Sequence, residues 1–459
     1  MKPNDKLLDH AVDLFPAPER SFDHLMRRRD RKRRNQRIGA GVLALAIAVV
    51  AIGGILFTVR SSGGVRPAKR SPAIDPSNAF GLHVVWMAET GNTPEGTGYG
   101  VAFAGGLAVV HADGLYAFPV DCVTDGWTCD PAWVAELPAT NADAAVLAAD
   151  ENKVYVSAGD VYAFRADCGV GGVTCVPSWI GHLGSGEASR PMVADGVVYA
   201  GGTDGRIYAF SADCGEGGSA CQPLWVGDTG FGPTRVEAVS DGVVYATSGN
   251  AITGFPVTCD ADCHATWKTT IRGADAISIT GAPGVLYVGA LVSGHGWDSH
   301  GSISAYAASC DALATCRPLW SDEVGGYPTS LVYANGVIYA LASGPHYPFS
   351  EAAFSAGSGD LLWSACSSSK TFDISCGLHG PSPTPAVAAD GLIWIVHARG
   401  TTAYPLSCGS GGAPCDPAWT STDGIYCPGY FCASKAGLAV SSTLVVRASG
   451  DGVVALGVG

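Results

Sequence analysis

The sixteen cysteines are the residues of this chain with the clearest capacity for chemistry, and all of them follow residue 120. They occur as sequential pairs at short, repeated spacings, which is typical of disulfides in a domain outside the cytoplasm. Zinc needs four convergent ligands, whereas each pair stands alone in its own segment, so we predict no metal site. The predicted disulfides are Cys122–Cys129, Cys168–Cys175, Cys214–Cys221, Cys259–Cys263, Cys310–Cys316, Cys366–Cys376, Cys408–Cys415 and Cys427–Cys432.

A second group of polar and aromatic side chains lies in two insertions and in the long connection after Trp363. Imidazole and carboxylate groups in such loops could bind a metal, but no spacing among them is diagnostic. Exposed aromatic rings on elaborated loops suit a protein or carbohydrate partner. The alternative is that these loops are neutral insertions that pack on one another. The predicted partner-binding residues are His295, Trp297, Asp298, His300, His346, Tyr347, Phe349 and His379.

The chain contains no nucleophile elbow, zinc-protease helix or phosphate-binding loop, so we predict no catalytic residue. His111, His182 and His397 lie in or beside strand-like segments. We expect these three histidines to be ordinary side chains with satisfied hydrogen bonds.

The elements that must position these side chains repeat eight times along the chain. Most copies have an Asp-Gly or Asn-Gly turn before a Val/Ile/Tyr run, as in Asp195–Ala200, and then an Ala-aromatic step, as in Tyr208–Phe210. The turn suits a hairpin because glycine takes φ > 0 without steric cost. The Ala-aromatic step recurs every 45 to 52 residues. This period predicts an all-β fold, an eight-bladed β-propeller of four-stranded blades, with seven blades as the alternative.

One tryptophan in each repeat marks the fourth strand of a blade. The first of them lies on a strand at Leu82–Trp86, before any complete repeat, and the last repeat has no such strand. We therefore predict that the N-terminal strand completes the final blade. Closure of this kind pairs strand edges that would otherwise invite aggregation.

Residues 38–59 are an uncharged, apolar stretch of 22 residues. As a helix this stretch would be about 33 Å long, enough to cross a hydrocarbon core of about 30 Å. Eight lysines and arginines at 27–37 precede it, which places the N-terminus in the cytoplasm and the repeats outside. A cleaved signal peptide is the alternative. We predict a cytoplasmic basic tail at 1–37, a single transmembrane helix at 38–59, a flexible linker at 60–80 and the propeller at 81–459.

Charge separates the two parts of the chain. Residues 1–37 hold 11 Lys/Arg against 6 Asp/Glu, whereas residues 71–459 hold 12 against 35. Nucleic-acid binding needs clustered Lys/Arg to neutralise phosphates, so the acidic repeats argue against a nucleic-acid partner. The basic tail is explained by the adjacent membrane segment.

The sixth repeat lacks the cysteine pair between its third and fourth strands and reads Ala-Phe-Ser-Ala-Gly-Ser-Gly-Asp-Leu-Leu-Trp over 353–363. It resembles the tryptophan-docking motif of the PQQ-like (quinoprotein alcohol dehydrogenase-like) propeller repeat, Ala-x-Asp-x-x-Thr-Gly-x-x-x-Trp. Gly359 and Trp363 match, and Ser355 and Ser358 replace Asp and Thr. The resemblance covers about 82–459. It implies that a tryptophan docks each blade on its neighbour: Trp86, Trp133, Trp179, Trp225, Trp267, Trp320, Trp363 and Trp419.

The same resemblance implies two classes of activity. Some members of the family are dehydrogenases that hold pyrroloquinoline quinone (PQQ) with Ca²⁺, and others are non-enzymatic scaffolds or sensor domains. The dehydrogenases carry a disulfide of adjacent cysteines, and this chain has no Cys-Cys dipeptide. We therefore expect a non-enzymatic, membrane-anchored, extracytoplasmic propeller without a cofactor. The alternative is a PQQ-dependent dehydrogenase with an atypical site.

Overall fold

The computed structural model of the protein divides the chain into two units, Met1–Arg70 and Ser71–Gly459. All of the described residues belong to the second unit, so the predicted basic tail and transmembrane segment lie outside them. Within the described residues, no helix is long and apolar enough to span a bilayer. The structure describes residues 72–91, 99–122, 128–138, 147–169, 174–184, 188–230, 232–271, 277–293, 300–310, 316–325, 327–343, 351–364, 386–397, 400–408, 413–421, 436–449 and 452–458.

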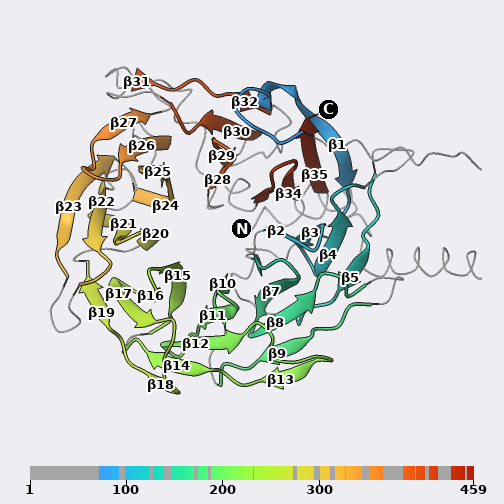
Figure 1. The fold of residues 1–459 in the computed structure, drawn as a ribbon, viewed down its shortest axis with the longest axis horizontal. Helices are drawn as coiled ribbons and strands as arrows, with labels where there is room; N and C mark the ends of the chain where they lie inside the picture. The colour runs from blue at the N-terminus through green and yellow to red at the C-terminus, as the bar shows by residue number, and fades with distance from the viewer. Residues whose placement is uncertain are drawn as a thin grey trace, which may run out of the picture. The chain divides into compact units, whose positions relative to one another are not determined.

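Eight sheets, each with four antiparallel strands, are arranged in a ring (Figure 1). We number them as blades 1 to 8 and letter the strands of each blade A to D from the centre outwards. Blades 1 to 4 consist of β2 (Gly100–Ala104), β3 (Leu107–His111), β4 (Leu115–Pro119), β5 (Trp133–Ala135); β6 (Leu147–Ala149), β7 (Lys153–Ala158), β8 (Asp160–Arg165), β9 (Trp179–Gly181); β10 (Met192–Ala194), β11 (Val197–Gly201), β12 (Arg206–Ser211), β14 (Trp225–Asp228); and β15 (Arg235–Ser240), β16 (Val243–Ser248), β17 (Ala251–Pro256), β19 (Trp267–Thr270).

Blades 5 to 8 continue the same order. They consist of β20 (Ile277–Ala282), β21 (Val285–Ser293), β22 (His300–Ala307), β23 (Pro318–Gly325); β24 (Tyr327–Ala334), β25 (Val337–Ser343), β26 (Glu351–Ser355), β27 (Leu361–Ser364); β28 (Val387–Ala389), β29 (Leu392–His397), β30 (Gly400–Pro405), β32 (Trp419–Thr420); and β33 (Gly437–Val440), β34 (Val445–Ser449), β35 (Gly452–Val458), β1 (Leu82–Ala88). The prediction of eight four-stranded blades is confirmed, and the seven-bladed alternative is wrong.

The ring is closed by the N-terminal strand, as predicted. Strand β1 pairs antiparallel with β35, from Leu82 opposite Val458 to Ala88 opposite Val453. Blade 8 thus takes its D strand from the start of the propeller and its A, B and C strands from the end. In Figure 1 the blue strand β1 lies beside the red strand β35.

The Asp-Gly turns join strands A and B as the sequence predicts. Asp195 has φ 49° and Gly196 has φ 74°, a left-handed pair that is typical of a two-residue hairpin turn. Asp and Asn are tolerated at the first position because their short side chains form local hydrogen bonds. The turns of three other blades repeat this geometry with Asp241–Gly242, Asn335–Gly336 and Asp390–Gly391.

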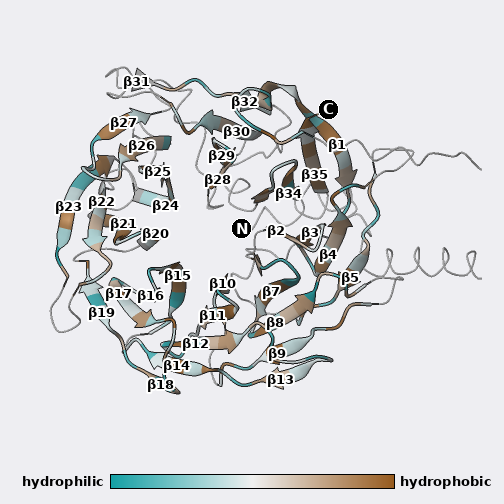
Figure 2. Ribbon diagram, in the orientation of Figure 1, coloured by the Kyte–Doolittle hydropathy of each residue, from teal (hydrophilic) through white to brown (hydrophobic). Residues whose placement is uncertain are grey.

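The hydrophobic core lies between neighbouring blades rather than in a single centre. One cluster combines Tyr155 and Trp179 of blade 2 with Val198 and Phe210 of blade 3, all of them buried. Because every blade packs against a neighbour on both faces, many strands, such as β4 and β34, are largely hydrophobic (Figure 2). The core therefore consists of a series of inter-blade clusters, and stability depends on each blade contacting the next.

A tryptophan fills each of these interfaces. The indole of Trp179 is fully buried, donates a hydrogen bond of 3.0 Å to the carbonyl of Ala212 in blade 3, and lies 5.9 Å from the rings of both Tyr155 and Phe210. The same indole-to-carbonyl bond across blades joins Trp86 to Val120, Trp133 to Ala166, Trp225 to Val257, Trp267 to Ala307 and Trp320 to Ala356. Trp363 is buried against Tyr404, whereas Trp320 and Trp419 are half-buried.

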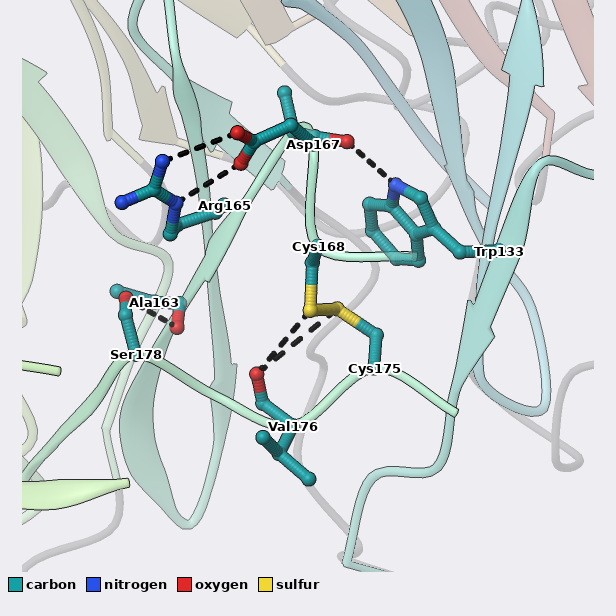
Figure 3. Close-up of a disulfide and its surroundings, with 9 residues drawn as sticks. Trp133, Ala163, Arg165, Asp167, Cys168, Cys175, Val176 and Ser178 are labelled. Atoms are coloured by element: carbon teal, nitrogen blue, oxygen red, sulfur yellow. Dashed lines mark hydrogen bonds and ion pairs between the residues drawn. A yellow bond between two sulfur atoms is a disulfide. The ribbon is translucent and has the colours of Figure 1, made fainter. Parts of the chain in front are cut away.

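Six of the predicted disulfides are present, each in the loop between strands C and D. They are Cys122–Cys129, Cys168–Cys175, Cys214–Cys221, Cys259–Cys263, Cys310–Cys316 and Cys408–Cys415. Cys366–Cys376 and Cys427–Cys432 lie outside the described residues. Figure 3 shows the second pair beside Trp133 of the preceding blade. The second cysteine of every described pair is buried, so each loop is fixed to the core as well as closed on itself.

The cystine loops also extend the preceding blade, which the sequence did not predict. Three of them form short fifth strands that run parallel to the D strand of the blade before: β13 (Ser219–Cys221) on β9, β18 (Asp262–Cys263) on β14 and β31 (Ala413–Pro414) on β27. The backbone N–H of Cys129 likewise donates to the carbonyl of Met87 in β1. These loops therefore cover outer strand edges that would otherwise be open to pairing.

We use two names for the faces of the ring. The cystine face carries the A–B turns and the C–D loops, and the loop face carries the B–C turns and the D-to-A connections. Blade 8 has no C–D loop, and the segment before β1 occupies that position. Ile74 and Ala79 are buried among Leu392, Trp394 and Leu456, and the N–H of Ile74 donates to the carbonyl of Ser442.

This packing corrects the predicted linker. We expected a flexible segment up to residue 80, but Ile74 and Ala79 belong to the core between blades 7 and 8. A short 3-10 helix, η1 (Ala79–Gly81), then leads into β1. The propeller therefore begins earlier than the sequence pattern indicated, because this segment lacks the repeat signature that marks the other blades.

Candidate functional site

The predicted partner-binding residues fall almost entirely outside the described part of the chain. His300 is the first residue of β22, and nothing is described of its side chain. The residues that lie outside are His295, Trp297, Asp298, His346, Tyr347, Phe349 and His379. The strands that carry the two insertions are described, and they define the place on the ring from which the insertions extend.

The B–C hairpins of blades 5 and 6 are longer than those of the other blades. Strands β21 and β22 remain paired up to Ser293 and His300, and β25 extends to Ser343. In blade 4, by contrast, a two-residue turn joins β16 to β17. The two blades are neighbours, because the N–H of Leu331 in β24 donates to the hydroxyl of Ser278 in β20 at 3.1 Å. Both insertions, 294–299 and 344–350, therefore begin on the loop face of one sector.

A buried carboxylate that we did not predict lies beside the second insertion. Glu351, the first residue of β26, is only 3% exposed. The hydroxyl of Tyr404 in blade 7 donates a hydrogen bond to it, and burial, followed by the charge of Glu351, raises the pKa of Tyr404 far above its usual value. One feature of the sequence could have indicated this residue: Glu351 is the only charged residue of β26 and stands at its start.

Charged residues also occur at the innermost strands of blades 3 and 4. We refer to Arg190, which precedes β10, and Arg235 and Glu237 of β15 as the inner-strand cluster. Apart from β15, none of the eight A strands contains a charged residue. Figure 2 shows hydrophilic residues on β15. Sequence reasoning missed this cluster because the A strands are the least regular part of the repeat.

Arg190 and Glu237 are half-buried and Arg235 is exposed, and their charges influence one another. Burial raises the pKa of the Glu237 carboxyl, opposed by the charges of Arg190 and Arg235 and by a 3.3 Å hydrogen bond from the Thr247 hydroxyl. Burial also lowers the pKa of Arg190, and the Glu237 charge opposes that change. Glu237 is the extra residue of a β-bulge, a feature that redirects a side chain and is frequent beside functional sites.

The three histidines that we expected to be satisfied differ in their surroundings. His182 lies 2.7 Å from the Asp160 carboxylate, as expected, and the side chain of His397 lies outside the described residues. The expectation is wrong for His111, the last residue of β3. Its Nδ1 atom is buried and has no hydrogen-bond partner among the described residues. Burial lowers the pKa of His111 to about 4, so the folded protein holds this ring neutral at pH 7.

The titration of His111 predicts a loss of stability in acid. The unfolded chain binds the proton near the ordinary pKa of about 6.5, so acid favours unfolding from about pH 6.5 down to about 4. Over that interval the wild type is expected to lose up to about 3 kcal/mol of its free energy of unfolding because of His111, and His111→Gln is expected to abolish this loss. Urea unfolding at pH 7.5, 6, 5 and 4 would measure it, with His83→Gln, at an exposed histidine of β1, as the control. If the His111→Gln variant and the wild type lose stability in parallel, the burial of a neutral ring is contradicted.

No group of three or more His, Cys, Asp or Glu residues in the described ranges is arranged to hold a metal ion. Of the residues for which a metal site was considered in the sequence, His295, Asp298 and His346 lie in the two insertions and His300 begins β22. The alternative of a dehydrogenase that holds PQQ with Ca²⁺ therefore stays a prediction.

The comparisons with known proteins concern the fold. No protein-family profile and no curated protein sequence matches the chain. Among solved structures, the computationally designed Ika8 protein has a TM-score of 0.56 at 14% identity, covering 81% of this chain and 99% of that one. Sqt1 of Saccharomyces cerevisiae has a TM-score of 0.52 at 10% identity, covering 84% and 98%. BamB of Moraxella catarrhalis, at 13% identity, has a TM-score of 0.48 and covers 82% and 97%.

The protein is thus an eight-bladed β-propeller with disulfide-bonded loops. Solved structures with such low sequence identity show the fold of this chain but not its activity, because one fold supports many functions. What the chain binds must be argued from its own surfaces.

Proposed function

We propose that the protein is a non-enzymatic, membrane-anchored propeller that displays its loop face outside the cell and binds a protein or carbohydrate partner there. The observation that carries this proposal is the pair of lengthened hairpins in neighbouring blades 5 and 6. Rigid scaffolds that bind partners place their recognition residues on loops of this kind. The insertions are rich in histidine and aromatic residues, which are favoured in binding surfaces.

Two further features support this proposal. The described segment before β1 lies over the A–B turns on the cystine face and does not cover the loop face. An uncharged stretch at 38–59 behind a basic tail would anchor the protein and export the acidic propeller.

We also propose that the repeats belong to the PQQ-like type. In blade 6 the turn at Ser355–Gly359 takes the place of a cystine loop, and Gly359 has φ 82°. A Cβ atom added at Gly359 would lie 2.8 Å from the ring of Trp320 in blade 5, so only glycine permits this close contact. This is the docking role that the resemblance assigns to the motif, and it carries no implication of quinone binding.

Removal of both insertions is expected to abolish partner binding without unfolding the ring. An Asn-Gly dipeptide can replace 294–299, because Ser293 and His300 already pair across the hairpin, and another can replace 344–350. The measurement compares the proteins and glycans that the full-length protein and the variant retain from the same membrane fraction, with thermal unfolding of both.

Leu224→Ser on the cystine face is the matched control, because Leu224 is 51% exposed on the opposite side of the ring. We expect this control to retain every partner. If the double replacement keeps its melting temperature and still retains every co-purifying partner, the assignment of the binding face to blades 5 and 6 is wrong.

A further inference from the structure

We propose that the outer edge of β23, the D strand of blade 5, pairs with an extended, basic segment of a partner protein. This site does not rest on the two insertions, and β23 is the outermost strand of its sector in Figure 1. In the described part of the chain, six of the eight D strands receive a backbone hydrogen bond or a parallel fifth strand from the cystine loop of the next blade. Strand β23 receives neither from any described residue.

The open edge follows from the unusual turn of blade 6. The turn at Ser355–Gly359 takes the place of a cystine loop, and its backbone bonds stay local: the N–H of Gly359 donates to the carbonyl of Ser355 at 2.8 Å. It approaches blade 5 only through the side chains of Trp320 and Asp322. The loop closed by Cys214–Cys221, by contrast, adds β13 to the edge of blade 2.

Equivalent strands indicate which backbone groups of β23 face outward. In four other D strands the residue directly after the tryptophan bonds to the next cystine loop, through the carbonyls of Met87, Val134 and Lys268 and the N–H of Val226. Ser321 has this position in β23. Because backbone groups alternate along an antiparallel strand, Glu323 faces outward as well. The edge therefore offers two N–H donors and two carbonyl acceptors to an incoming strand.

Strand β23 is long and accessible enough to bind a peptide. With 8 residues it is the longest of the D strands in the structure. Leu319 is 61% exposed, and residues 321–323 are exposed as well. An extended peptide that adds to such an edge gains affinity from main-chain hydrogen bonds and specificity from its side chains.

The charges along this edge favour a basic occupant. Asp322 and Glu323 are exposed, and Asp360 belongs to the turn whose Gly359 lies against the Asp322 carboxylate. With Arg317 before the strand, these residues amount to three carboxylates and one cation. Opposite charges stabilise a pair of neighbouring strands, whereas like charges destabilise it. A second copy of this chain would bring two acidic strands together, so the occupant is a strand that carries Lys or Arg.

The test uses the full-length protein in detergent and a fluorescein-labelled heptapeptide of alternating lysine and valine. We expect saturable, one-to-one binding at physiological ionic strength, where unspecific attraction between exposed charges is screened. The same peptide with N-methyl groups along its backbone keeps its charge but cannot donate to a strand edge. It should bind at least about tenfold more weakly, because main-chain hydrogen bonds supply the affinity.

A pair of double variants tests the position of the site. Asp322→Asn with Glu323→Gln should weaken peptide binding at least about threefold. Asp260→Asn with Asp262→Asn is the matched control, because these exposed carboxylates lie on the cystine loop that already covers the edge of blade 3. The control should bind like the wild type. So should the variant that lacks both insertions, which separates this site from the loop face.

A grafted cystine loop should close the edge. Residues 213–223 can replace 357–361, because the N–H of Ala212 bonds to Gly196 as that of Ala356 bonds to Gly336. We expect this graft to abolish peptide binding. The proposal is overturned if the wild type shows no saturable binding, if the N-methylated peptide binds equally well, or if the two double variants behave alike. A dimer that the graft converts to a monomer would also overturn it, because the occupant would then be a second copy.

Discussion

A chain that ends at Ser449 is expected to lose the cooperative unfolding of the wild-type protein. This truncation removes β35, which pairs with both β34 and β1, so blade 8 loses its third strand and β1 loses its antiparallel partner among the described strands. It also removes Leu456 and Val458 from the cluster that holds blades 7 and 8 together. Two strand edges would then be open in a fold whose stability depends on closure. Far-ultraviolet circular dichroism during heating would measure the effect.

The matched control changes the same strand pair without opening it. Val85 is the bulged residue of β1 and is 39% exposed, so Val85→Ser is expected to alter stability by less than about 0.5 kcal/mol. A synthetic peptide with the sequence of residues 450–459 should restore part of the transition when it is added to the truncated protein. A truncated chain that melts at the wild-type temperature would show that β1 does not close the ring.

Replacement of a buried inter-blade tryptophan is the second change from which we expect a large effect. Trp179→Ala should cost about 3–5 kcal/mol, because it leaves a cavity between Tyr155 and Phe210. The carbonyl of Ala212 would also lose its donor, which typically costs about 1 kcal/mol more. Chemical denaturation of the full-length variant, compared with the wild type, would give the difference.

Two variants separate the causes of that loss. Trp419→Ala is the matched control in blade 7, where the indole is half-buried, and we expect about 1–2 kcal/mol because less apolar area is lost. Trp179→Phe keeps most of the packing but removes the indole donor. Equal losses for the two alanine variants would contradict the view that burial between blades determines the contribution of each tryptophan.

The sequence predicted the ring well because its signals are local and repeated. Asp-Gly before a Val/Ile/Tyr run predicts a left-handed turn, and Asp195 and Gly196 have that conformation. A lone tryptophan strand before the first repeat, with none after the last, was enough to predict closure through β1. Neither inference needed knowledge of which side chains meet across blades.

Contacts between blades were harder to predict. Cysteine spacing indicated a loop closed within one blade, but it cannot show that Ser219–Cys221 pairs with the D strand of the preceding blade. Arg190 and Glu237 are far apart in sequence, and their charges influence each other only because the fold brings blades 3 and 4 side by side. All of the predicted partner-binding residues except His300 lie outside the described residues, His295 and Tyr347 among them, so their role stays a prediction.

Closure by β1 has a consequence for how the protein is made. The chain is synthesised from its N-terminus, so β1 is the first strand of the propeller to emerge, and β35, its partner, is the last. Contacts between distant parts of a chain form slowly, because the entropy of closing the loop must be overcome first. Until β35 has been synthesised, the nascent chain carries β1 without its partner, and that strand is a natural target for chaperones and for pairing with a neighbouring copy.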